Sequence, residues 1–197
     1  MIIAIMGASG SGKSTIESMF QSIGCEKIII TTTRLARVDE QDGVDYHFVD
    51  VPIFEEKIRR GEMLEWDLYS QNRYYGIAID SIPEDKNSVV VVTPNGYRAL
   101  KKLEGDNVIG IYLTASLGNR MIRYIQRCGA DKFNYDDKNE LCARVERDYG
   151  MFLGIVKEAD IIADTNTGIH TTMDFILEML KRKGVDIYAL DKKDISL

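Results

Sequence analysis

The fold that this sequence predicts is decided by the stretch Gly7-Ala8-Ser9-Gly10-Ser11-Gly12-Lys13-Ser14. It matches the pattern G-x-x-x-x-G-K-[ST], and it lies between an apolar run at residues 2–6 and a helical pattern at residues 14–20. Glycines allow successive backbone N–H groups to curl around phosphate oxygens, and the N-terminus of the following helix attracts the same anion. Lys13 can reach the β- and γ-phosphates of a nucleotide, and the Ser14 hydroxyl can bind Mg²⁺. We therefore expect a site for ATP with Mg²⁺ as cofactor, with Lys13 in a catalytic position and Ser14 as the metal ligand. The expected ATP-binding residues are Gly7, Ser9, Gly10, Ser11, Gly12, Lys13, Ser14 and Thr15.

Short apolar runs rich in β-branched residues recur along the chain and indicate strands buried on both faces of a parallel sheet. They lie at residues 2–6, 27–30, 89–92, 108–113 and 160–163. Helical patterns separate these runs, at residues 14–20, 96–103, 117–127, 138–158 and 171–183. The helix expected at 138–158 carries Leu141, Val145, Phe152 and Val156 at near-helical spacing. This alternation predicts an α/β fold in which helices flank a parallel sheet, and together with the phosphate-binding loop it indicates the three-layer P-loop type.

Two segments interrupt the alternation and indicate insertions over one edge of the sheet, where ligands of open α/β folds bind. Residues 31–82 hold short strand-like pieces, many aromatic residues and one small helix expected at residues 51–60. Residues 128–137 are polar and contain glycine. Because the chain has only three prolines and no low-complexity tract, we expect one domain over residues 1–197. Its core would comprise residues 1–30, 83–127 and 138–197.

The composition narrows the classes of partner that the protein can have. Lys and Arg number 25 against 31 Asp and Glu, and this net charge of -6 disfavours a nucleic acid or an anionic membrane as partner. No apolar run approaches the roughly 20 residues that span a bilayer, and the apolar N-terminus is too short for a signal peptide. Cys25, Cys128 and Cys142 form no C-x-x-C pair, which argues against a disulfide framework or a zinc site. We therefore expect a cytoplasmic protein.

A second phosphate site is indicated downstream of the loop by Arg34, Arg37 and Tyr46. Guanidinium groups bind phosphate oxygens through two parallel hydrogen bonds, and a tyrosine hydroxyl adds a neutral donor. The sequence lacks the pattern N-K-x-D, by which GTPases read their base. These residues predict that the molecule receiving phosphate from ATP already carries a phosphate group.

The sequence resembles the guanylate kinase family, whose members transfer phosphate from ATP to GMP, and the resemblance runs nearly end to end. Besides the phosphate-binding loop, three blocks carry it. The first is T-T-R-x-x-R-x-x-E-x-x-G-x-D-Y-x-F at residues 32–48. The second is E-M-L-E-W at residues 62–66, followed by N-R-Y-Y-G at residues 72–76. The third is R-Y-I-Q-R at residues 123–127, followed after an insertion by Arg144.

For the acceptor nucleotide, the resemblance implies an anion site and a base reader. The monophosphate would be held by Arg34, Arg37, Tyr46 and Tyr75, with Glu40 in support. Glu65 would read the base, because a carboxylate only accepts hydrogen bonds and so matches the N1–H and 2-amino donors of guanine.

For ATP, the resemblance implies a hinged lid at residues 128–137 that closes over the phosphates. Arg123 and Arg127 would come from this lid and Arg144 from the helix behind it. These arginines would act in catalysis, because phosphoryl transfer depends mainly on positioning and on stabilising charge.

At several positions the sequence departs from the family. Ile30 and Ile77 stand where the family has small hydroxyl residues. The family also ends one long strand with two aspartates, two residues apart, before a Gln-Gly pair, whereas residues 91–96 here read V-V-T-P-N-G. Thr93 therefore stands where the family has an aspartate that helps to read the base. We expect Thr93 to contact the acceptor nucleotide in its place. Mg²⁺ would rest on Ser14, phosphates and water, which suits an ion that keeps several waters.

Three functions stay open on the sequence alone. The leading one is a nucleoside monophosphate kinase that phosphorylates GMP or dGMP. The lost aspartates favour a related kinase for another nucleoside monophosphate or for a phosphorylated sugar. A non-catalytic binding module, as in scaffold proteins, usually carries a degraded phosphate-binding loop, and the intact loop and lid arginines here favour an enzyme.

Overall fold

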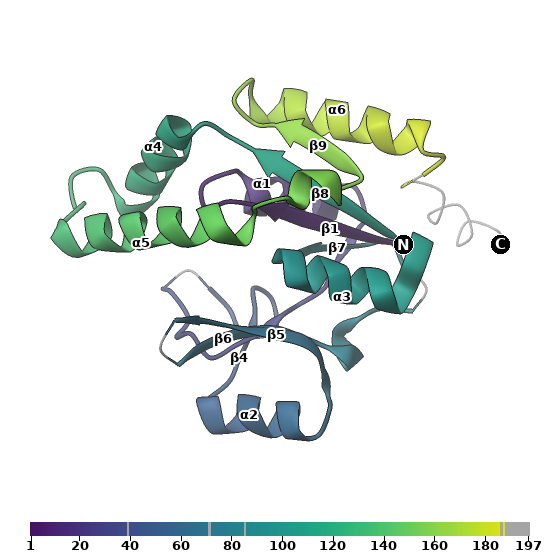
Figure 1. Cartoon of the computed structure of the whole chain (residues 1–197), viewed down its shortest axis with the longest axis horizontal. Helices are drawn as coiled ribbons and strands as arrows, with labels where there is room; N and C mark the ends of the chain where they lie inside the picture. Colours follow the sequence, from purple (N-terminus) through teal and green to yellow (C-terminus); the bar gives the residue numbers. More distant parts are fainter. Residues whose placement is uncertain (39, 71, 85, 186, 188–197) are drawn as a thin grey trace.

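Five parallel strands form the first sheet, in the order β2-β7-β1-β8-β9, with β1 at its centre (Figure 1). This arrangement confirms the predicted parallel sheet, and β1 is followed at once by the phosphate-binding loop. The strands are β1 (Ile2–Gly7), β2 (Glu26–Lys27), β7 (Ser88–Val91), β8 (Val108–Thr114) and β9 (Ile161–Asp164).

This computed structural model describes residues 1–38, 40–70, 72–84, 86–185 and 187. The end of the predicted core range, at residues 186 and 188–197, lies outside the described residues. Within the described part of the chain, none of the helices is both long and apolar enough to cross a membrane.

The predicted strand at residues 27–30 is wrong in its extent, because β2 comprises only Glu26–Lys27. The N–H of Ile28 still donates to the carbonyl oxygen of Val89 at 2.9 Å. Two residues later the carbonyl oxygen of Ile30 accepts from the N–H of His47 at 3.0 Å, which belongs to the second sheet. The strand therefore ends because the backbone exchanges one partner strand for another.

Two apolar cores enclose the first sheet and give the predicted three layers. Side chains alternate along β1, so Ile3 and Ile5 enter the core under α1 (Lys13–Ser22) and α6 (Ile169–Arg182). The intervening side chains enter the opposite core, which includes Tyr97 and Leu100 of α3 (Pro94–Glu104). The short helix η2 (Gly105–Asn107) then joins α3 to β8.

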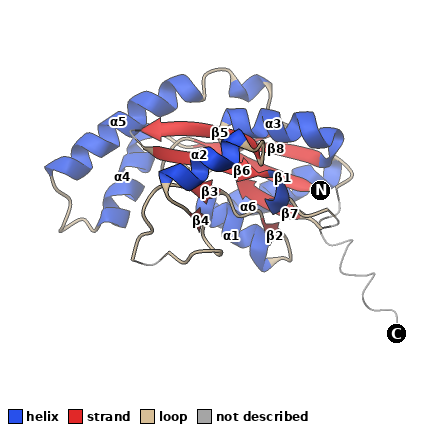
Figure 2. Cartoon of the chain, turned by 90° about the horizontal axis from the view of Figure 1, so that it is seen from below, coloured by secondary structure: helices blue, strands red, loops and turns tan. Residues whose placement is uncertain are grey.

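The inserted segment builds a second sheet of four strands in the order β4-β3-β6-β5. Its strands are β3 (Thr31–Thr32), β4 (His47–Phe48), β5 (Met63–Ser70) and β6 (Arg73–Ala78), and η1 (Ile79–Ser81) follows β6. The helix α2 (Val51–Arg59) agrees with the expected helix at 51–60, and its buried Phe54 stacks on Tyr74 with ring centroids 5.1 Å apart. Seen from below, α2 and the β5–β6 hairpin lie in front of the first sheet (Figure 2).

At one end of the molecule, α4 (Leu117–Cys128) and α5 (Tyr135–Met151) lie side by side (Figure 1). The helix predicted at 138–158 is wrong at both ends. It starts earlier because the Asn134 side chain accepts the N–H groups of the next turn in a capping box. It ends earlier because the backbone turns at Gly154, which has a φ of 85° and is the N-cap residue of η3 (Ile155–Lys157). Val156, one of the four apolar residues at near-helical spacing, is consequently half exposed, whereas Ile155 is buried.

Because the central strands are buried, we expect a smaller side chain there to lower the free energy of unfolding. Ile111 of β8 is fully buried, whereas Ile162 of the neighbouring β9 is 42% exposed. We expect Ile111→Ala to lower the free energy of unfolding by about 2–5 kcal/mol, because the sheet cannot close the resulting cavity. The control Ile162→Ala is expected to cost less than about 1 kcal/mol. Urea unfolding measures both, and equal losses would contradict the assignment of this core.

Candidate functional site

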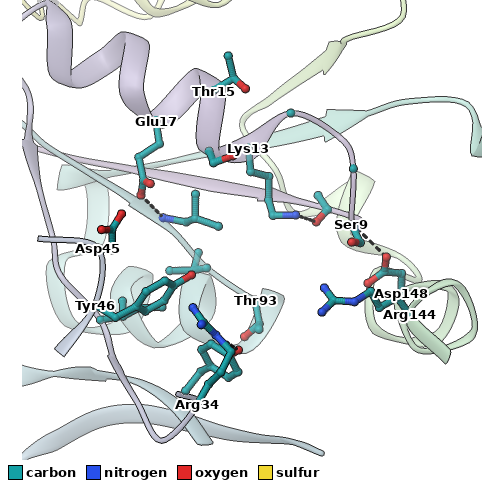
Figure 3. Close-up of a pocket in the computed structure, with 18 of the residues that line it drawn as sticks. Ser9, Lys13, Thr15, Glu17, Arg34, Asp45, Tyr46, Thr93, Arg144 and Asp148 are labelled. Atoms are coloured by element: carbon teal, nitrogen blue, oxygen red, sulfur yellow. Dashed lines mark hydrogen bonds between the residues drawn. The ribbon is translucent and has the colours of Figure 1, made fainter. Parts of the chain in front are cut away.

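A cavity of about 610 Å³ lies between the phosphate-binding loop, the second sheet and the pair α4–α5. Figure 3 shows Lys13 and Ser9 on one side of it and Arg34 and Thr93 on the other. Of the residues predicted for the site, Ser11 alone is not part of the lining and is fully buried beside Gly7. The predicted residues that do line the cavity are Gly7, Ser9, Gly10, Gly12, Lys13, Ser14, Thr15, Arg34, Arg37, Glu40, Tyr46, Glu65, Tyr75, Thr93, Arg123, Arg127 and Arg144.

The phosphate-binding loop leads directly into α1, which starts at Lys13. Two of its glycines, Gly10 and Gly12, have φ of 78° and 90°, a backbone conformation that L side chains rarely adopt. The N-terminal end of α1 therefore faces the loop, where its unpaired N–H groups and its dipole favour an anion. This geometry is what the sequence pattern predicts for a polyphosphate site.

The Lys13 ammonium lies inside this loop, and no carboxylate of the described residues forms an ion pair with it. Its Nζ donates to the carbonyl oxygens of Gly7 and Ala8 at 2.6 and 3.0 Å. Burial lowers the pKa of Lys13 to about 8; the charge of Asp148 opposes this shift, and three nearby arginines add to it. An anion placed beside Lys13 would restore the ordinary preference for the charged ammonium.

A buried ion pair that sequence reasoning missed braces the loop against α4 and α5. The Asp148 carboxylate accepts the N–H of Ser9 at 2.6 Å and pairs with Arg120 at 3.0 Å. Arg120 also donates through Nε to the carbonyl oxygen of Ser9 at 2.8 Å. Asp148 lies four residues after Arg144, so the helical period could have placed both residues on the same face of α5.

The three predicted lid arginines differ in how their guanidinium groups are engaged. Arg123 donates to the carbonyl oxygen of Gly10 at 3.1 Å and to Thr165, so it ties the loop to the end of β9. Arg144 pairs with Glu140 one turn earlier on α5. Burial, followed by repulsion from Arg37 and Arg144, lowers the pKa of Arg127. Arg127 therefore lies in a local excess of positive charge that a polyphosphate would neutralise.

The second predicted anion site is already ordered around Glu40. Its carboxylate binds the Arg34 guanidinium through two hydrogen bonds, at 2.7 and 2.8 Å, and accepts the N–H of Arg37 at 2.9 Å. The Nε of Arg34 donates to the hydroxyl oxygen of Tyr75 at 3.2 Å, and its guanidinium stacks over the ring of Tyr46 at 5.1 Å. Because these contacts immobilise the guanidinium beforehand, less side-chain entropy is lost when a phosphate binds.

Two carboxylates of β5 lie on the wall beneath this anion site. Glu65 and Asp67 are two residues apart on one strand, so both project from the same face, and both line the cavity. Burial, followed by the negative charge of Asp67, raises the pKa of Glu65 to about 7. Glu65 was predicted from the sequence, whereas Asp67 was missed although its period-two spacing from Glu65 could have identified it.

Another cavity residue missed at the sequence level is Glu17 on α1 (Figure 3). It lies one helical turn after Lys13, and this spacing is the signal that could have found it. Its Oε1 accepts the N–H of Val91 at 3.2 Å, a backbone group that β2 no longer reaches. Burial raises the pKa of this carboxyl group. Asp45 lies nearby on the same side of the cavity and was not predicted from the sequence either.

Comparisons with known proteins agree with this geometry. A family model described as guanylate kinase matches residues 1–173. The guanylate kinase of Chlorobium chlorochromatii is 32% identical over 152 residues, which cover 74% of this chain and 77% of that protein. The guanylate kinase of Chlorobaculum tepidum is 31% identical over 181 residues, which cover 89% of each chain. The crystal structure of guanylate kinase from Anaplasma phagocytophilum has a similar fold, with a TM-score of 0.66 and 19% identity over 93% of this chain and 85% of that one.

The loop, its helix and the parallel sheet define a P-loop nucleotide-binding protein, in which Arg34 and Arg37 line the same cavity as the loop. With the family model matching most of its length, the chain belongs to the guanylate kinase family and is an ATP-dependent phosphotransferase. The resemblance inferred from the sequence is thereby confirmed.

The ion pair of Asp148 with Arg120 predicts a marked loss of stability when one partner is removed. We expect Asp148→Ala to lower the free energy of unfolding by about 3–5 kcal/mol, because it leaves a largely buried guanidinium without its counter-charge and the Ser9 N–H without its acceptor. As control, Glu178→Ala removes the exposed pair with Arg182 and should cost less than about 1 kcal/mol. Chemical denaturation of both variants tests this, and similar small losses would contradict a bracing role.

Proposed function

We propose that the protein transfers the γ-phosphate of ATP to GMP or dGMP and releases the corresponding diphosphate. The observation that carries this proposal is the Glu65 carboxylate, which lines the same cavity as the phosphate-binding loop and the Arg34–Glu40 anion site. A carboxylate matches the adjacent N1–H and 2-amino donors of guanine and repels the acceptor nitrogen at N1 of adenine. The matches to guanylate kinases support the same acceptor.

We assign the acceptor phosphate to Arg34, Arg37, Tyr46 and Tyr75, with Glu40 holding the two arginines in place. Lys13 and the N–H groups at the start of α1 would bind the phosphates of ATP. Arg127 and Arg144 would neutralise charge that develops during transfer, and Arg123 would hold the loop to which it donates. Because the acceptor is already an anion, these residues act by positioning and charge, and none needs to act as a strong base.

The residues around Ser14 suit a magnesium ion that arrives with ATP. Ser14 lines the cavity in the first turn of α1, and its hydroxyl is the hard oxygen ligand that Mg²⁺ prefers. Within the described residues, no group of three or more His, Cys, Asp and Glu side chains is arranged to hold a metal ion by itself. The protein would therefore supply one hydroxyl, and phosphates and water the remaining ligands. Mg²⁺, when bound, would neutralise charge on the transferred phosphate.

The two segments that interrupt the alternation of strands and helices would complete the site. Residues 31–82 would bind the acceptor, and residues 128–137 would form the hinged lid that closes over the phosphates of ATP. Residues 129–134 of this lid connect α4 to α5. A cytoplasmic location and the lack of a nucleic-acid or membrane partner stay predictions from composition.

An ADP-release assay against a panel of acceptors tests the function. We expect activity with GMP or dGMP and a fall of at least about tenfold in kcat/KM for the variant Glu65→Gln, because a charge-assisted pair of hydrogen bonds is lost. The matched control Glu55→Gln changes an exposed glutamate of α2 and should keep wild-type rates. Activity confined to a nucleotide without guanine, or to a phosphorylated sugar, would overturn the proposed acceptor.

The raised pKa of Glu65 predicts a pH dependence for the acceptor. Below pH 7 the carboxyl group is protonated and cannot accept hydrogen bonds from both donors of guanine, so binding weakens as the pH falls through about 7. We expect kcat/KM for GMP, measured at saturating ATP, to rise between about pH 6 and pH 8.

The variant Glu65→Gln separates this effect from titration of the acceptor phosphate itself, whose second pKa is about 6. The variant should lose the part of the profile centred near pH 7 and keep the part that belongs to the phosphate. Identical profiles for the two proteins would show that Glu65 does not control acceptor binding.

A further inference from the structure

The side chain of Asp67 faces the acceptor side of the cavity together with Glu65. In the β5–β6 hairpin Glu65 is paired with Ile77 and Asp67 with Tyr75, and all four residues line the cavity. Trp66, between the two carboxylates, is absent from this lining and contacts Tyr74 of β6, with ring centroids 5.8 Å apart. Because side chains alternate along a strand, both acidic side chains of β5 project into the site.

The first turn of α3 holds both carboxylates close together. The hydroxyl of Thr93, the N-cap residue of α3, donates to Oδ2 of Asp67 at 3.1 Å, and the amide of Asn95 lies 3.5 Å from Oδ1. A Cβ on Gly96 would lie only 2.5 Å from Oε2 of Glu65, so glycine leaves the space that the Glu65 carboxylate occupies. The positive end of the helix dipole thus faces two negative groups.

Asp67 has no cationic partner in the part of the chain that the structure describes. Among the described residues, no Lys, Arg or His nitrogen pairs with its carboxylate within 4.0 Å, and both of its partners are neutral donors. A half-buried carboxylate beside a second one is costly to keep at a cavity wall unless further donors bind there. The natural complement is a ligand with several N–H groups on one edge.

Guanine has such an edge, with one N1–H and two hydrogens on its 2-amino group. One carboxylate can accept the N1–H and one amino hydrogen in parallel, and the second amino hydrogen then needs another acceptor. Resting on the proposed function, we propose that Asp67 is this acceptor and determines specificity for the 2-amino group of the base. Asp67 thus supplies from β5 the carboxylate that the chain lacks at Thr93, and Thr93 acts as a positioning residue that orients it.

The test compares GMP with IMP, whose base lacks only the 2-amino group. We expect the ratio of kcat/KM for GMP to that for IMP to fall about tenfold in Asp67→Asn and Asp67→Ala, because a hydrogen bond to a charged acceptor is lost. Calorimetric titration with the two nucleotides gives the same ratio from binding alone. A purely structural role would lower both values by one factor and leave the ratio unchanged, and that result would overturn the inference.

Further variants keep the result interpretable. Thr93→Val removes the hydroxyl that orients Asp67 and should also lower the ratio, whereas Thr93→Ser keeps the hydroxyl and should restore it. The control Asp80→Asn changes an exposed aspartate of η1 and should keep the wild-type ratio. Thermal melting identifies any variant that fails to fold.

Failure of this inference and failure of the proposed function give different results. Equal use of GMP and IMP by the wild-type protein would overturn the role of Asp67 while leaving guanylate kinase activity in place. Absence of both activity and binding with GMP would overturn the proposed acceptor and, with it, this role of Asp67.

Discussion

The close approach of Gly10 to the backbone of α4 is the contact on which the rest of the site depends. A Cβ at this position would lie 2.6 Å from the carbonyl oxygen of Arg120, and the φ of 78° is itself unfavourable for other residues. Glycine therefore allows the loop to lie directly against α4. In this position Arg120 and Arg123 donate to the carbonyl oxygens of Ser9 and Gly10. These hydrogen bonds fix the position of α4 relative to the loop.

The distribution of charge divides the cavity into two chemically different halves. Near the loop positive charge predominates: burial, with added repulsion from arginines, lowers the pKa values of Lys13 and Arg127. On β5 negative charge predominates: burial, followed by repulsion from Asp67, raises the pKa of Glu65. A nucleotide with phosphates at one end and N–H donors at the other relieves both imbalances, which is the physical basis of the acceptor that we propose.

Much of the fold follows from local sequence patterns. The apolar run after Met1 predicts a strand buried on both faces, and all six residues of β1 are buried. The ends of elements are less predictable when distant partners decide them. β2 ends because Ile30 finds a hydrogen-bond partner in His47 on another sheet. The start of α5, by contrast, is encoded locally in the capping box that Asn134 forms with Asp137.

The sequence by itself determined the nucleotide loop, its lysine and the arginines at residues 34 and 37, because spacing along one loop or one helix is enough to bring these groups together. Only the tertiary structure decided what orients them. The ion pair of Arg120 with Asp148 and the hydrogen bond of Thr93 to Asp67 join residues 28 and 26 positions apart on different elements. No local period links such residues, since their contact exists only after the elements have packed against one another.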